Sequence, residues 1–195
     1  MVAELGDDSW LARWLPLVAE RAGGHSILEL GCGSGRDSAT LADAGHTVVG
    51  VDLSGDAIER ACSRVPSARF YCQDIRAPFP APPGVGVVVA SLSLHYFPWE
   101  ETVDLVERIR NHLRRGGVLL CRLNSTGDVH YGAVGHPWIA GDYYLVDGEP
   151  KRFFDRGGVD ELFRRGWRIT SLEEHVVNRY AHPKVLWEVI LERDT

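Results

Sequence analysis

Ile27-Leu28-Glu29-Leu30-Gly31-Cys32-Gly33-Ser34-Gly35-Arg36-Asp37 is the stretch that decides the fold, and Val48-Val49-Gly50-Val51-Asp52-Leu53-Ser54 completes it. A short apolar run followed by three alternating glycines predicts a buried parallel strand, a tight loop and a helix that begins directly afterwards. Glycines allow positive φ and let a ligand approach the main chain without meeting a Cβ. The free N–H groups at the start of the helix favour an anionic group there. The stretch therefore predicts a loop that binds a small ligand.

Asp52 indicates that the ligand is a nucleotide. It closes the second apolar run and lies 21 residues after Gly31, about where this type of nucleotide-binding unit places an acid for ribose hydroxyls. The dinucleotide fingerprint requires glycine or alanine at the sixth position from Gly31, because helix and strand pack closely there. That position is Arg36, which argues against a pyrophosphate cofactor.

The alternation Glu29-x-Gly31-x-Gly33-x-Gly35, with Asp52 and the later segments, resembles class I S-adenosylmethionine (SAM)-dependent methyltransferases over about residues 26–193. In that family the loop wraps the methionine part of the cofactor, and the acid after the second strand binds both ribose hydroxyls. An acid after the third strand meets the adenine amino group, and the next residue packs on the ring; Asp74 and Ile75 match by position, with a plain turn as the alternative for Asp74. The resemblance implies a cofactor set of Glu29, Gly31, Cys32, Gly33, Gly35, Asp52, Leu53, Asp74, Ile75 and Ser91.

Composition is that of a soluble globular protein. The chain has 195 residues, 45% apolar and 25% charged, enough for one domain with a substantial core. No apolar run approaches the roughly 20 residues of a membrane span, and the acidic residues 1–8 do not resemble a signal peptide, so we expect a cytoplasmic protein without a membrane partner. A net charge of -6 with scattered arginines argues against bulk nucleic-acid binding. The four cysteines show no CxxC spacing and are expected to be buried, reduced thiols.

The order of elements predicts a doubly wound α/β fold. Strands are expected at 26–30, 47–51, 68–75, 85–93 and 118–123, and helices at 10–18, 35–44, 54–65 and 100–115, the last closed by Gly116-Gly117. Two further strands, 167–177 and 185–191, are joined by the six-residue turn 178–183 and must be antiparallel. We therefore expect a Rossmann-like seven-stranded sheet, mostly parallel with an antiparallel last strand, in a three-layer αβα arrangement.

The fourth strand runs into Leu94-His95-Tyr96-Phe97. Ligands of open parallel sheets bind outside the carboxyl ends of strands, so these side chains should border the reacting groups. The ordinary pKa of imidazole makes His95 a candidate general base; packing or shielding of the cofactor is the alternative. Tyr96, His130, Tyr131 and His136 are weaker candidates, and we expect His95, Tyr96 and His130 to form the catalytic set.

Residues 124–155 form an unusually long segment rich in aromatic and glycine residues. Such segments are usually functional, so we expect a substrate lid inserted in a single domain of residues 1–195; the alternative is that it covers a sheet edge. The N-terminal Trp10 and Trp14 either join this lid or pack on the sheet. The expected substrate contacts are Trp10, Trp14, Tyr131, His136, Trp138 and Tyr143.

The resemblance implies methyl transfer from SAM by SN2 displacement, leaving S-adenosylhomocysteine. The protein must mainly align the partners and desolvate the nucleophile, and no metal-ligand spacing is present. The C-terminal part looks closest to small-molecule enzymes of the broad group that includes tellurite-resistance methyltransferases, so we expect a small-molecule acceptor, methylated on O or N, and a monomer or homodimer. RNA, protein or peptide methylation and a non-catalytic SAM-binding role remain as alternatives; the Asn/Asp-Pro-Pro-Tyr/Phe segment typical of nucleic-acid amino methylation is absent, since Ser91-Leu92-Ser93-Leu94 occupies its place.

Overall fold

A seven-stranded sheet organises the molecule, and the computed structural model describes residues 9–194 of the chain. The strand order is β3-β2-β1-β4-β5-β10-β9. The element bounds are β1 Ile27–Leu30, β2 Val48–Asp52, β3 Arg69–Cys72, β4 Val85–Ser91, β5 Leu113–Asn124, β9 Trp167–Val177 and β10 Lys184–Arg193. The first five strands pair in parallel, and β1 is buried along its whole length, as the continuous apolar run predicts.

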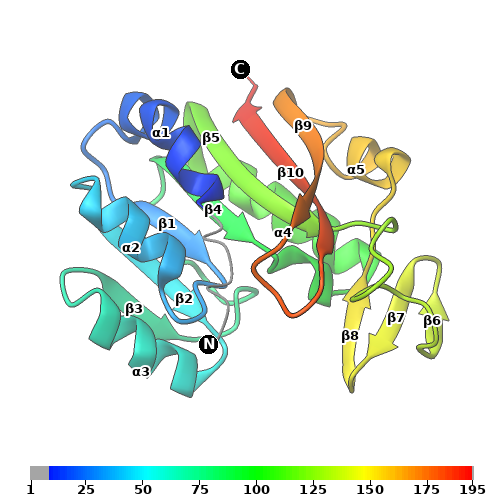
Figure 1. Ribbon diagram of the computed structural model, residues 1–195. Coiled ribbons are helices and arrows are strands. Elements are labelled where there is room, and N and C mark those ends of the chain that lie inside the picture. The colour runs from blue at the N-terminus through cyan, green and yellow to red at the C-terminus, as the bar shows by residue number, and fades with distance from the viewer. Residues whose placement is uncertain (1–8, 195) are drawn as a thin grey trace.

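Helices cover both faces of this sheet (Figure 1). The 3-10 helix η1 (Trp10–Trp14), α1 (Leu15–Ala22), α2 (Arg36–Asp43) and α3 (Gly55–Arg64) lie on one side, and α4 (Trp99–His112) and α5 (Arg156–Leu162) on the other. Alternate side chains of the strands divide between two cores: Val87 and Val89 pack with Leu11 and Leu41, whereas Val88 and Ala90 pack with Leu105 and Val159. The predicted three-layer arrangement is confirmed.

The direction of β10 confirms the reversed last strand. It pairs antiparallel with β5, for example Val189 with Cys121, and antiparallel with β9 on its other side. Consequently the first residue of β10, Lys184, lies at the same end of the sheet as the carboxyl ends of the parallel strands.

The predicted end of the helix before β5 is wrong. The helix α4 ends at His112, and Leu113 is already extended and pairs with Val85. Burial explains the early switch, because Leu113 is 1% exposed and packs in the core. Gly116, at φ +68°, lies within β5, where the pairing register with β4 shifts.

The expectation for the cysteines is partly wrong: all four are free thiols, but only Cys32 and Cys121 are buried, whereas Cys62 and Cys72 are exposed.

A second, three-stranded antiparallel sheet occupies the middle of the 124–155 segment. It consists of β6 (Trp138–Ala140), β7 (Tyr143–Val146) and β8 (Glu149–Arg152). In Figure 1 the small sheet projects beside the main sheet, below α5. A hydrogen bond of 2.8 Å from Tyr143 Oη to the Tyr96 carbonyl connects it to the short 3-10 helix η2 (Leu94–Tyr96).

Within residues 9–194, no helix combines the length and apolar character needed to cross a membrane.

Gly86, near the start of β4, is required by the close approach of α1. A Cβ built at Gly86 would lie 1.8 Å from the Arg21 carbonyl oxygen and 3.2 Å from Ala22 Cα. The carboxyl end of α1 therefore packs directly on the backbone of β4, where a larger side chain has no room.

We predict that Gly86→Ala lowers the free energy of unfolding by about 1–3 kcal/mol, because the added methyl group must displace backbone atoms. Gly55→Ala is the matched control, since nothing lies within 4 Å of the added Cβ and alanine favours the helix by up to about 1 kcal/mol. Urea unfolding measures both. Equal stability of the Gly86 variant and the wild type would show that α1 does not pack on β4 in this way.

Candidate functional site

Two adjoining cavities lie at the end of the sheet where the parallel strands have their carboxyl ends. The first, about 510 Å³, extends from the glycine loop to β8 and β10. The second, about 580 Å³, extends from the same loop to the ends of β2 and β3. They share Gly31, Gly33, Leu92 and Tyr96 as lining residues, so the glycine loop stands between two halves of one site.

Each glycine of the loop has its own reason to lack a side chain. A Cβ on Gly31, at φ +73°, would lie 2.4 Å from Ser93 Cβ, because the loop crosses directly over the end of β4. A Cβ on Gly35 would lie 3.1 Å from Ala61 of α3. Gly33, at φ +52°, has no heavy atom within 4 Å of the Cβ position. The first and third glycines thus serve packing, and the second exposes bare main chain to both cavities.

Asp52 is tied to this loop, as expected for an acid that works with it. Its Oδ2 accepts a hydrogen bond of 2.8 Å from the Gly33 N–H, and its Oδ1 accepts one of 2.9 Å from the Ser54 N–H. Asp52 lines the second cavity together with Leu53, whose side chain is 71% exposed. An acidic group and an apolar surface therefore lie side by side at the end of β2.

Carboxylates gather at the loop end of the first cavity. Glu29 is 2% exposed and accepts a hydrogen bond from the Ser38 hydroxyl. Burial, reinforced by the negative charges of Asp37 and Asp52, raises the pKa of Glu29 well above its usual range. Asp37 also lines this end of the first cavity, and Asp52 lines the second cavity, so the acids lie on both sides of the glycine loop.

The far end of the second cavity has the lining expected for a flat aromatic ring. Ile75 and Phe97 provide apolar surface. Asp74 also lines it, but both its oxygens accept hydrogen bonds from Arg76, at 2.7–3.1 Å, and these bonds lower the pKa of Asp74. The Arg76 backbone N–H also donates to Asp74 Oδ1, at 2.8 Å. Each oxygen of Asp74 therefore already accepts two contacts from Arg76.

His95 lies between the two ends of the first cavity, on η2. It is 3% exposed, and its Nδ1 has no hydrogen-bond partner among the described residues. Burial, followed by the positive charges of Lys184 and Lys151, lowers the pKa of His95 to about 3. The ordinary imidazole pKa, which made His95 a candidate base, therefore does not apply in the folded protein. Tyr96 beside it is 37% exposed, and burial raises the pKa of its phenol.

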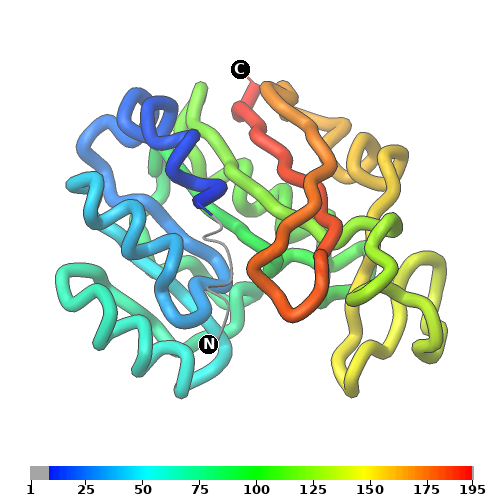
Figure 2. Tube along the Cα trace, viewed as in Figure 1, coloured from blue at the N-terminus to red at the C-terminus, as the bar shows by residue number. Residues whose placement is uncertain are grey.

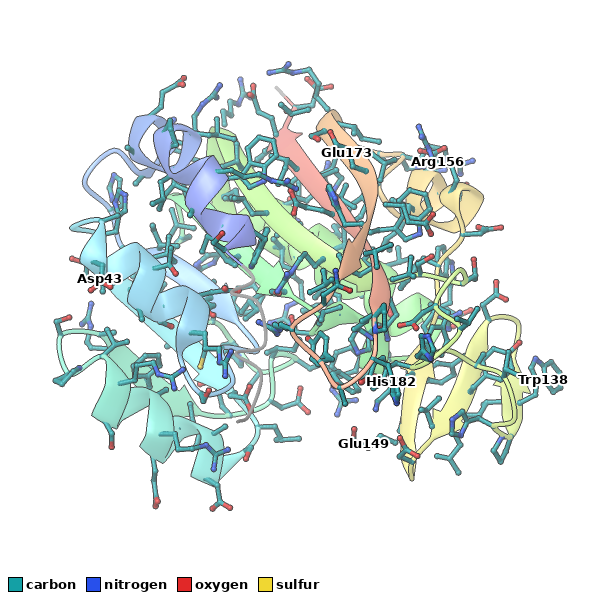
Figure 3. The ribbon with its side chains drawn as sticks, viewed as in Figure 1. Asp43, Trp138, Glu149, Arg156, Glu173 and His182 are labelled. Atoms are coloured by element: carbon teal, nitrogen blue, oxygen red, sulfur yellow. The ribbon has the colours of Figure 1, made fainter. Side chains whose placement is uncertain are left out.

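Aromatic side chains from two segments far apart in the sequence line one side of the first cavity. Figure 2 shows the chain path of these segments, the loop after β5 and the hairpin between β9 and β10. The His130 ring stacks on His182 at 5.1 Å, and Tyr131 Oη accepts a hydrogen bond of 3.0 Å from the His182 N–H. Tyr131 also lies 5.7 Å from the Tyr180 ring. The loop after β5 and the hairpin between β9 and β10 thus form one wall, and in Figure 3 His182 lies beside the small sheet.

Most of the predicted site residues line these cavities, and five do not. Trp10 is buried and donates to the Asp37 carboxylate at 3.1 Å, and Trp14 donates to Glu188 Oε1 at 2.6 Å, so both pack against the main sheet. Trp138 is 67% exposed and points outward in Figure 3. Tyr143 holds the Tyr96 carbonyl, and Gly35 contacts α3. Direct ligand contact by these five has no support in the structure.

Sequence reasoning missed several lining residues, among them Leu92, Lys151 and Lys184. Leu92 adopts φ +57°, a conformation that a leucine rarely adopts and that no sequence pattern marks. Lys184 carried a readable signal: it precedes a strand predicted to be antiparallel, so it had to lie at the carboxyl edge of the others. Within the described residues, no group of three or more His, Cys, Asp or Glu side chains has the geometry of a metal site.

Comparisons with known proteins find similarity to methyltransferases. Residues 27–117 match a methyltransferase domain family. The trans-aconitate 2-methyltransferase of Delftia acidovorans is 35% identical over 117 residues, which are 58% of this chain and 41% of that protein. The chain thus spans less than half the length of the curated relatives it matches.

Solved structures extend the likeness beyond the matched segment. A SAM-dependent methyltransferase from Methanosarcina mazei has a TM-score of 0.75 at 17% identity, covering 92% of this chain and 97% of that one. The Burkholderia thailandensis 1,6-didemethyltoxoflavin-N1-methyltransferase, solved with its substrate and S-adenosylhomocysteine, has a TM-score of 0.73 at 18% identity, covering 97% and 80%. At these identities the likeness shows the fold. Residues 27–117 thus match a methyltransferase domain, and the described chain has the fold of SAM-dependent methyltransferases.

Proposed function

We propose that the protein transfers a methyl group from SAM to a small-molecule acceptor bound in the first cavity. The observation that carries this proposal is the position of the glycine loop, which borders both cavities through Gly31 and Gly33. One ligand can therefore reach from the second cavity past the loop and meet another ligand beside His95. We also propose that this small-molecule acceptor is methylated on O or N. We likewise propose that the chain is most similar to the group of small-molecule methyltransferases that includes the tellurite-resistance enzymes.

The residues present fit SAM. Asp52 and Leu53 at the end of β2, with Ile75 and Phe97, would hold the adenosine, and the bare main chain at Gly33 would lie along the methionine part. The acids Glu29, Asp37 and Asp52 suit a cofactor with a sulfonium and an ammonium group, because a bound cation would favour their ionised forms. When bound, SAM supplies a methyl group already activated by the positive sulfur.

The chain itself then has to orient the acceptor and exclude water. His95 is suited to donating an N–H bond rather than to removing a proton, since an imidazole with a pKa of about 3 gains little by accepting one. We propose that residues 124–155 act as the lid on the acceptor side. Tyr143 would position the lid through its 2.8 Å bond to the Tyr96 carbonyl, and Lys151 lines the first cavity from β8.

Activity is tested directly by incubating the protein with isotopically methyl-labelled SAM and a metabolite extract, followed by mass spectrometry. A labelled product below the size of a peptide supports the proposal. Label found only in RNA or protein would contradict the small-molecule acceptor, and absence of any labelled product would contradict methyl transfer.

Calorimetric titration should show that S-adenosylhomocysteine binds with a Kd in the micromolar range. We predict that Asp52→Ala weakens this binding by about 1–3 kcal/mol, because charged hydrogen bonds are lost. Asp56→Ala, an exposed change on α3 outside both cavities, is the control. Undiminished affinity in Asp52→Ala would remove Asp52 from the site, and failure of the folded wild type to bind would refute the cofactor assignment.

The lowered pKa of His95 predicts a stability that depends on pH. The unfolded imidazole binds a proton near pH 6.5, whereas the folded one does so at about 3. Between these values the unfolded state binds more protons, so the free energy of unfolding falls as pH drops, by up to about 1.4 kcal/mol per pH unit from this residue.

A glutamine at position 95 cannot take up this proton in the unfolded state. The loss of stability between pH 7 and pH 5, measured by urea unfolding, should be smaller in His95→Gln than in the wild type by about 2 kcal/mol. His25→Gln, which changes an exposed imidazole before β1, should leave the loss unchanged. An identical pH dependence in His95→Gln and the wild type would show that His95 titrates normally.

A further inference from the structure

The end of the first cavity opposite the glycine loop contains both lysines of the chain. Lys151 and Lys184 are the only lysines among its 21 Lys and Arg residues. They come from different parts of the fold, β8 in the small sheet and the start of β10 in the main sheet. Both line the first cavity together with His95.

Lys184 is buried but loosely paired. Lys184 is 9% exposed, and its Nζ lies 3.4 Å from Asp128 Oδ2. This distance is longer than the about 2.7–2.9 Å that is typical of a charged N–H···O bond. Asp128 already accepts bonds from the backbone N–H groups of His130 and Tyr131, at 3.1 and 2.9 Å. An ammonium group has three donors, and within residues 9–194 Asp128 is its one acceptor. Donor capacity therefore remains for a ligand.

Lys151 adds a second positive charge with a weak counter-ion. Its Nζ lies 3.6 Å from Glu149, whose side chain is 64% exposed, and exposed pairs of this kind contribute little. The pKa of Lys184 is lowered first by burial and, despite Asp128, also by the charges of Lys151 and Arg122. Like charges thus converge on one end of the cavity, which favours an anion there.

His95 supplies a neutral donor in the same place. His95 is 3% exposed, and its Nδ1 lacks a hydrogen-bond partner among the described residues. A neutral imidazole carries one N–H. Because the His95 side chain lines the first cavity, an oxyanion bound beside the ring would accept a hydrogen bond when that proton is on the nitrogen that faces the cavity.

We propose that Lys184, Lys151 and His95 form an oxyanion subsite, and that the methyl acceptor is a small organic acid whose carboxylate or phosphate binds there. This inference rests on the proposed function and specifies its substrate class. The site then has acids near the glycine loop for the cationic cofactor and, beyond His95, two lysines for the acceptor.

The test uses the full chain saturated with S-adenosylhomocysteine and titrated calorimetrically with benzoate, phenyl phosphate and neutral benzamide. We expect benzoate or phenyl phosphate to bind with a Kd of about 1 mM or tighter, and benzamide to bind at least about tenfold more weakly. The stronger of the two anions identifies the group. Failure of both anions to bind, or binding of benzamide equal to theirs, would overturn the proposal.

Variants locate the anion. Lys184→Met should weaken binding of the anion by about tenfold or more, as expected for loss of a charged hydrogen bond, and Lys184→Arg should restore most of it. Lys151→Met, at a partly exposed position, provides the same test if Lys184→Met fails to fold. Arg156→Met, on the exposed surface of α5, is the control. Unchanged anion affinity in folded Lys184→Met or Lys151→Met would overturn the proposal.

A titration with S-adenosylhomocysteine alone separates the two proposals. If the wild type and both lysine variants bind it equally, the lysines serve the acceptor, as proposed. If the lysine variants lose affinity for it, the anion bound there is the cofactor's own carboxylate, and the acceptor subsite is refuted. If the wild type does not bind it, the proposed function itself fails, whatever the anions do.

Discussion

The site depends on a steric constraint, the crossing of the glycine loop over the end of β4. Only the absence of a side chain at Gly31 permits this crossing, since a Cβ would lie 2.4 Å from Ser93 Cβ. The Ser93 hydroxyl donates a bond of 2.6 Å to the Leu30 carbonyl and fixes the same contact. Leu92, next to it, adopts φ +57° and lines both cavities. Strain of this kind persists where the surrounding structure enforces it, and it is common at functional sites.

Charge then distinguishes the two ends of the space that this crossing leaves. Glu29 and Asp52 sit on the parallel strands β1 and β2, whereas Lys184 begins the antiparallel β10. Reversal of one strand thus brings a residue from the start of β10 to the edge where the other strands end. In the proposed reaction, such an arrangement aligns a cationic donor with an anionic acceptor by electrostatics as well as by shape.

The sequence predicted the main sheet and most of the residues that line the cavities around the glycine loop, because both follow from local patterns. Apolar runs mark buried strands, alternating glycines mark the loop, and the short connection before β10 forces its direction. The part of the first cavity beyond His95 was harder to predict. Trp138 and Trp14 were chosen for their residue type, but their burial and partners depend on packing between distant segments. The pKa of His95 likewise depends on burial and on two lysines, one of them 89 residues further along the chain.

The most direct test of the account is a crystal structure of the protein with S-adenosylhomocysteine bound. The account predicts the ribose hydroxyls on Asp52, the adenine between Leu53, Ile75 and Phe97, and the sulfur facing the part of the first cavity that holds His95 and Lys184. Ligand density away from Gly33 and Asp52, or a sulfur atom facing away from His95, would contradict it.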